Sequence, residues 1–304
     1  MSTPRSLQMS HRIRQTSIRT ARGPFAALCA EPAGGVGERQ PALLVPGYTG
    51  SKEDFLAVLE SLAAPGRAIF AIDLRGQYES EPAADRAGYQ LGQLARDIGA
   101  VAGAIAGDSG QVHLLGHSFG GLVARAAVLH EPGAYLSLTL LASGPGAIGG
   151  QRARVLHDLL GYLKPAGDDV AKLSAMILRL WDSQFGPLAE AQGTPADIIE
   201  FLRTRTLRNC PLGMVVMAEL LLSCPDSTAD LASAGGLPIL VSYGENDDAW
   251  SPDVQDLMAK RLGAERICIP GAAHSPAVEA PETTAAMLTS FWKLAESSAG
   301  QISG

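Results

Sequence analysis

The chain has 304 residues, of which 46% are hydrophobic and 18% charged, a composition typical of a globular protein with one large core and room for a smaller accessory domain. Its 24 basic and 31 acidic residues give a net charge of -7. This mild acidity argues against nucleic acid or an anionic membrane as a partner. No apolar run approaches the roughly 18–20 residues that a membrane-spanning helix needs, so the sequence favours a soluble protein with a small-molecule substrate.

The cysteines and the basic N-terminal stretch bear on location. The four cysteines are scattered without paired spacing and indicate reduced thiols in a cytoplasmic protein, neither a disulfide framework nor a zinc site. The first thirty residues carry arginines but no Asp or Glu, and no apolar signal-peptide segment follows them. We therefore interpret this stretch as a loose basic tail leading into a first strand. The sequence leaves the oligomeric state open, including a homodimer.

In chain order, short apolar runs alternate with helical patterns, which is typical of a parallel sheet with crossover helices. An antiparallel hairpin at residues 16–19 and 25–29 is expected at one edge. The strands predicted after it are apolar at consecutive positions, as in strands buried on both faces: 42–45, 68–72, 112–115, 137–141, 239–242 and 266–269. The helices predicted between and after them are 52–64, 91–106, 120–130, 253–261 and 282–294.

The alternation breaks between the fourth and fifth of these strands. Residues 147–235 show helical periodicity, proline punctuation and no convincing strand. The sequence therefore predicts an α/β fold with a mostly parallel sheet, helices on both faces and an inserted all-helical cap. We assign residues 1–146 and 236–304 to the core domain and 147–235 to the cap domain.

The strongest local motif is GHSFGG at residues 116–121, directly after a predicted strand and before a predicted helix. It fits the G-x-S-x-G nucleophile elbow in the context that this motif requires. Glycines are needed because the serine occupies a sharp, strained turn in which neighbouring side chains would clash. The turn also places the hydroxyl at a helix N-terminus, where developing negative charge is stabilised. Ser118 is the predicted nucleophile.

A serine nucleophile needs a base and an acid that orients it. Of the six histidines, His274 has the best position, because it lies on a loop of small residues after the last predicted strand, at the sheet edge where α/β proteins place their sites. The loop after the preceding strand carries Asp247 and Asp248. The chain order serine, aspartate, histidine is that of the elbow motif, and either aspartate could be the acid on this reasoning.

Two backbone N–H groups are expected to form an oxyanion hole. One belongs to Phe119, the residue after the nucleophile. The other belongs to Tyr48, in the glycine-containing loop after the strand at 42–45. Because these donors are backbone groups, the side chains of Tyr48 and Phe119 are free to line the acyl pocket. We expect the side chains of Tyr48, His117 and Trp250 to contact substrate.

Over residues 20–145 and 236–296 the sequence resembles the α/β-hydrolase superfamily, in the stretches PGYTGSKEDF, DLRGQYES, GHSFGG, GENDDAWSP and GAAHSPAVEAPE. In that family the acid usually stands three residues after the glycine of the GxxD turn, which favours Asp247. The loop after the third strand usually begins His-Gly, whereas Pro46 stands here. Tyr78 replaces the second glycine of the D-x-R-G-x-G-x-S loop, which changes the edge of the pocket.

The resemblance implies a serine hydrolase that cleaves a carboxylic ester or related acyl bond through an acyl-enzyme, with no metal and no organic cofactor. The apolar cap favours a small, fairly apolar substrate. Haloperoxidases, carbon–carbon bond hydrolases, acyltransferases and hydrolase-fold small-molecule receptors share the same residues and remain alternatives. The arginines at 203, 205 and 208 are interpreted as a solvated helix face, with carboxylate recognition as the alternative.

Overall fold

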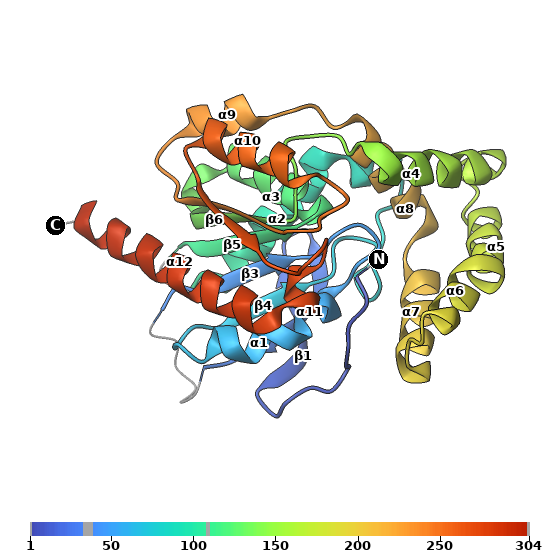
Figure 1. The fold of residues 1–304 in the computed structure, drawn as a ribbon, viewed down its shortest axis with the longest axis horizontal. Coiled ribbons are helices and arrows are strands. Elements are labelled where there is room, and N and C mark those ends of the chain that lie inside the picture. The colour runs from blue at the N-terminus through green and yellow to red at the C-terminus, as the bar shows by residue number, and fades with distance from the viewer. Residues whose placement is uncertain (1, 33–38, 108–109, 303–304) are drawn as a thin grey trace.

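A computed structural model describes residues 2–32, 39–107 and 110–302. Its centre is an eight-stranded sheet with the order β1-β2-β4-β3-β5-β6-β7-β8 (Figure 1). β1 and β2 form an antiparallel hairpin, β2 is antiparallel to β4, and all other neighbours are parallel. The strands are β1 (Ile13–Thr20), β2 (Gly23–Ala30), β3 (Ala42–Val45), β4 (Ile69–Ile72), β5 (Val112–His117), β6 (Tyr135–Leu141), β7 (Ile239–Gly244) and β8 (Glu265–Ile269).

The central strands are buried along their whole length, because helices cover both faces of the sheet. Every residue of β3, β5 and β6 is buried. One face packs against α2, α3 and α10, and the other against α1, α11 and α12. The helices of the core are η1 (Lys52–Phe55), α1 (Leu56–Ala63), η2 (Arg86–Tyr89), α2 (Leu91–Ile105), α3 (Phe119–His130), η4 (Pro132–Ala134), α10 (Pro252–Leu262), α11 (Pro276–Glu279) and α12 (Pro281–Ile302).

The predicted elements are confirmed, with one difference in burial. We expected residues 266–269 to be buried on both faces, and this is wrong. β8 is the last strand of the sheet and pairs only with β7, so Glu265, Arg266 and Cys268 are exposed while Ile269 is buried. An edge strand can tolerate such polar and charged side chains, which also discourage pairing with another chain.

The regular elements between β6 and β7 are all helices, as predicted. Figure 1 shows α4 to α7 extending to one side of the core, while α9 lies beside α10. α8 returns to the core, where Val216, Met217 and Leu221 join the main apolar cluster. The inserted elements are α4 (Gly150–Leu163), η5 (Lys164–Ala166), α5 (Val170–Leu180), η6 (Trp181–Phe185), α6 (Gly186–Ala191), α7 (Ala196–Arg208), α8 (Pro211–Ser223) and α9 (Thr228–Ala234). The domain boundaries at 147 and 235 stay predictions.

Within the described ranges, no single helix combines the length and apolar character needed to cross a membrane. Only α8 and α9 taken together meet that criterion, and the chain bends by 88° between them.

Candidate active site

Ser118 occupies a strained turn between β5 and α3. Its backbone has φ 55° and ψ -120°, a conformation that costs a non-glycine residue free energy and persists only where the surroundings enforce it. The neighbouring glycines explain how the turn fits. A Cβ at Gly116 would lie 2.2 Å from the Gly120 carbonyl oxygen, and one at Gly120 would lie 2.5 Å from the Pro46 carbonyl oxygen. The elbow therefore needs glycine on both sides of the serine.

The structure brings Ser118, His274 and Asp247 into one hydrogen-bonded chain. Ser118 Oγ is 2.9 Å from His274 Nε2, and His274 Nδ1 is 2.9 Å from Asp247 Oδ1. A carboxylate only accepts hydrogen bonds, so Nδ1 carries the proton and the lone pair on Nε2 faces the serine hydroxyl. All three residues are buried.

Asp247 and Asp248 have different surroundings. Asp247 accepts hydrogen bonds from the Ala249 N–H and from the Gln255 side chain, both at 2.9 Å, in addition to the one from His274. Asp248 points outward, with 65% of its side chain exposed, and forms an ion pair with Arg152 at 2.6 Å. That hydrogen bond from Arg152 lowers the pKa of the Asp248 carboxyl. The geometry therefore places Asp247, and not Asp248, in the hydrogen-bonded chain that reaches Ser118.

The loop after β3 lies against the elbow. A Cβ at Gly47 would be 3.0 Å from the Ser118 Cβ, so only glycine lets this loop approach so closely. The Gly47 carbonyl accepts hydrogen bonds from the Gln77 side chain at 2.9 Å and from the Gly50 N–H at 3.1 Å. These contacts fix the peptide that leads to the N–H of Tyr48, one of the two predicted oxyanion donors.

His117 lies next to His274. Its Nε2–H donates to the His274 carbonyl oxygen at 2.7 Å, and the two imidazole rings are 5.2 Å apart. Burial, with the nearby positive charge of a protonated His274, lowers the pKa of His117 to about 3. His117 is therefore a neutral donor near neutral pH. It borders the cavity, and its contact with substrate stays a prediction.

Trp250 and Phe119 do not line the cavity, contrary to expectation. Trp250 is 3% exposed and its indole N–H donates to the carbonyl oxygens of Gly146 and Ala147, at 3.2 and 3.3 Å. A Cβ at Gly144 would lie 2.0 Å from the Trp250 ring. The turn after β7 directs the Trp250 side chain into the protein, where it packs against the loop after β6. The Phe119 side chain is fully buried in the core.

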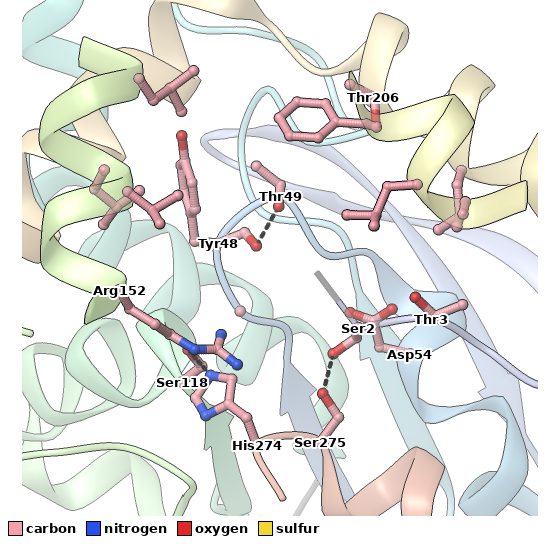
Figure 2. A pocket seen from close by; sticks show the side chains of 18 of the residues that line it. Ser2, Thr3, Tyr48, Thr49, Asp54, Ser118, Arg152, Thr206, His274 and Ser275 are labelled. Carbon is pink, nitrogen blue, oxygen red and sulfur yellow. Dashed lines mark hydrogen bonds between the residues drawn. The ribbon is translucent and has the colours of Figure 1, made fainter. Parts of the chain in front are cut away.

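A cavity of about 570 Å³ opens above Ser118 and His274, between the core and the cap (Figure 2). One side is apolar, formed by α4 and α5 together with Tyr48, whose buried hydroxyl has no hydrogen-bond partner among the described residues. Figure 2 shows that hydroxyl pointing away from Ser118 toward the cap. The apolar lining includes Ile148, Leu156, Leu159, Ile177, Leu180, Trp181, Phe185, Leu202, Met214 and Leu221.

The N-terminal segment closes the other side of this cavity, and the expectation of a loose tail is wrong. Ser2 and Thr3 line the cavity. The Ser2 hydroxyl lies 2.8 Å from that of Ser275, the residue after His274, and the Ser2 carbonyl accepts a hydrogen bond from Arg205 at 2.7 Å. Leu7 adds apolar contacts to both the core and the cap. Specific contacts, not charge, therefore position this segment.

The arginines of α7 are not a uniformly solvated face. The Arg205 side chain is fully buried and pairs with Asp54 of η1 at 2.7 Å, which joins cap to core. Arg208 lies 3.5 Å from Glu79 and stacks over the ring of Tyr78, 5.2 Å from its centre. The role of Arg205 is thus structural, since its charge is used inside the protein.

Residues 42–287 match the model of the Alpha/beta hydrolase family. The chain belongs to this family. It is 36% identical over 107 residues to RutD of Variovorax paradoxus, which is named as a carbamate hydrolase. The match covers 35% of this chain and 39% of that protein, so this alpha/beta hydrolase matches well under half of that relative.

Solved structures show the same fold. A protein from Acinetobacter baumannii, named as a lipase, has a TM-score of 0.74 at 19% identity, with 94% of this chain and 93% of that chain covered. An esterase from Exiguobacterium antarcticum has a TM-score of 0.69 at 19% identity, with coverages of 92% and 100%. Family membership and the similarity to RutD support a hydrolase.

Several site residues of this alpha/beta hydrolase were missed by the sequence analysis. Gln77, Gln255 and Arg152 touch the site, but single polar residues in loops or at helix starts carry no periodic signal. The position of Gln77 in the DLRGQYES stretch could have pointed to it. Within the described part of the chain, no three His, Cys, Asp or Glu side chains are grouped to hold a metal ion.

Proposed function

We propose that the protein hydrolyses a carboxylic ester, or a related acyl bond, through an acyl-enzyme on Ser118. The observation that carries the proposal is the hydrogen-bonded chain from Asp247 through His274 to Ser118, which ends at the floor of a largely apolar cavity. A serine hydroxyl is a weak nucleophile by itself, and this arrangement supplies the base that activates it.

In the first half-reaction, Ser118 Oγ attacks the substrate carbonyl carbon while His274 Nε2 takes the hydroxyl proton. The charged imidazole then gives that proton to the leaving alcohol as the carbon–oxygen bond breaks. Water repeats the sequence on the acyl-enzyme and releases the acid. Asp247 keeps the proton on Nδ1 and stabilises the imidazolium, and the Gln255 and Ala249 contacts hold the carboxylate in position.

The N–H groups of Tyr48 and Phe119 are the proposed oxyanion donors. They belong to the two segments whose close approach Gly47 permits, and Phe119 is the first residue of α3, where the helix dipole also favours negative charge. Removing one such donor typically costs about 3–4 kcal/mol of transition-state stabilisation. This contribution is independent of the triad.

The cavity favours a substrate that is mainly apolar. Apart from Arg152, its lining from α4, α5 and α8 consists of aliphatic side chains, and η6 adds Trp181 and Phe185. These side chains contribute roughly 25 cal/mol for each Å² of apolar substrate surface that they remove from water. Sugars and phosphate esters would leave several polar groups without partners there, at a cost for each. Medium-length acyl esters fit this lining best.

Intact mass spectrometry after incubation with a fluorophosphonate tests the proposal. We expect a single adduct on the wild type and none on Ser118→Ala. A thermal denaturation curve of the variant would verify that it is folded. If the folded wild type takes up no adduct and binds apolar ligands without converting them, the protein is a receptor on this fold and the hydrolase proposal fails.

A further inference from the structure

Arg152 is the one cation among the described residues that line the cavity. It belongs to the first turn of α4, and in Figure 2 its guanidinium extends from the cap toward the imidazole of His274. Its side chain is 35% exposed. A positive charge at this end of a largely apolar cavity is not required by the proposed hydrolytic mechanism.

The other charged groups lining this cavity already have partners inside the protein. Asp54 is paired with the buried Arg205. Glu279 accepts hydrogen bonds from the backbone N–H groups of Ala273 and Ser275. These acids are therefore fixed parts of the wall, whereas Asp248 is the one hydrogen-bond partner of Arg152 among the described residues.

The outer partner of Arg152 occupies a small part of its donor capacity. Asp248 accepts one hydrogen bond from Nη2, and a guanidinium has five N–H donors. Because the Asp248 side chain is 65% exposed, water weakens this ion pair. A substrate carboxylate bound in the cavity can therefore compete for the guanidinium or share it.

We infer that Arg152 binds a carboxylate of the substrate, on the side of the cavity next to the carbonyl that Ser118 attacks. The inference rests on the proposed function and narrows its substrate class to mainly apolar esters that carry one carboxylate. A single arginine, shared with Asp248 and facing a wall that contains two acids, matches a monoanion. A phosphate dianion would need more donors.

The test compares anionic and neutral esters on matched variants. The probes are p-nitrophenyl monoesters of dicarboxylic acids of increasing length, each paired with the ester whose terminal carboxylate is replaced by a methyl group. The measured quantity is the ratio of kcat/KM for the anionic to the neutral member, corrected for spontaneous hydrolysis. Wild type, Arg152→Gln, Arg152→Lys and Asp248→Asn are compared, with thermal denaturation as the check on folding.

We expect the wild type to favour the anionic member at one acyl length. Arg152→Gln should lower the ratio roughly tenfold or more, since a hydrogen bond to a charged group is lost. Arg152→Lys should retain part of the preference. Asp248→Asn should maintain or raise it, because the competing carboxylate is gone while the cation remains.

Two results would overturn the inference. One is a ratio that Arg152→Gln leaves at the wild-type value. The other is an equal effect of Arg152→Gln and Asp248→Asn on both esters, which would make the pair a purely structural link between cap and core. Fluorophosphonate labelling of the same preparations separates these results from failure of the proposed function, since labelled enzyme with no charge preference rejects only the role of Arg152.

Discussion

The side-chain amide of Gln77 donates to the carbonyl oxygen of Gly47 at 2.9 Å. This contact connects the loop after β4 to the loop after β3, and the same peptide unit that contains the Gly47 carbonyl provides the Tyr48 N–H. The side-chain oxygen of Gln77 in turn accepts from the Leu74 N–H at 3.2 Å, so the amide is held at both ends. Gln77 is 3% exposed. It is therefore a positioning residue for the proposed oxyanion hole.

Gln77→Ala should reduce kcat by about tenfold, because the Gly47 carbonyl keeps only the Gly50 N–H as a donor. The lost hydrogen bond is worth roughly 0.5–1.5 kcal/mol, and without it the loop can shift. KM should change little, since the substrate-binding side chains remain. Steady-state kinetics with a neutral ester measure both constants. An unchanged kcat together with a raised KM would show that Gln77 shapes the binding cavity and not the oxyanion hole.

Two glycines, Gly120 in the elbow and Gly103 in helix α2, offer a matched pair of substitutions. Gly120→Ala places a Cβ 2.5 Å from two backbone carbonyl oxygens, whereas a Cβ at Gly103 meets nothing within 4 Å. We expect Gly120→Ala to destabilise the protein by several kcal/mol, or to prevent folding. Gly103→Ala should stabilise it by about 0.5–1 kcal/mol, because alanine favours a helix interior. Chemical denaturation measures both, and equal effects would contradict the crowding argument.

The buried His117 should make stability depend on pH. Its pKa is lowered from 6.5 to about 3, so between these values the unfolded chain binds more protons than the folded one. The contribution of neutral His117 is complete above pH 6.5 and is lost as the pH falls toward 3, at up to about 1.4 kcal/mol per pH unit. Unfolding free energies of wild type and His117→Asn at several pH values test this. The two curves should converge on acidification; parallel curves would contradict the burial of a neutral imidazole.

Substitutions of the two aspartates after β7 should have clearly different effects on the rate of ester hydrolysis. Asp247→Asn removes the carboxylate that fixes the imidazole tautomer, and we expect kcat to fall by about 10³–10⁴-fold. Asp248→Asn lies outside the hydrogen-bonded chain and should reduce the hydrolysis of a neutral ester by less than tenfold. Similar losses in both variants would mean that the loop rearranges and that either carboxylate can serve the histidine.

Much of the site could be predicted because its parts sit where strands end. Parallel strands bring their carboxyl ends to one edge, so loops that are distant in sequence, such as those of Ser118 and His274, meet there. The structure brings these two residues and Asp247 within hydrogen-bonding distance. Their catalytic roles remain proposals, but their convergence follows from strand order and from the glycines that permit the elbow.

The features that could not be predicted depend on contacts between distant segments. Arg205 looks like part of an exposed charge run in the sequence, and only the position of Asp54 across the cap–core boundary makes it buried. The run at 266–269 is expected to be buried on both faces, yet β8 lies at the sheet edge beside β7, where Arg266 and Cys268 are exposed. In both cases local pattern gives the element correctly and tertiary context decides its burial.

The N-terminal segment should set the length of acyl group that the cavity accepts, because Ser2 and Thr3 form one of its walls. Deleting residues 2–6 should open that wall and shift the preference toward longer p-nitrophenyl esters. Thr3→Trp should fill space there and shift it toward shorter ones. Measuring kcat/KM across a chain-length series tests both variants. If the segment forms a wall, the preferred acyl length should shift in opposite directions in the two variants. A loss of activity that is equal for all chain lengths in both variants would indicate that the segment only stabilises Ser275 and the neighbouring His274.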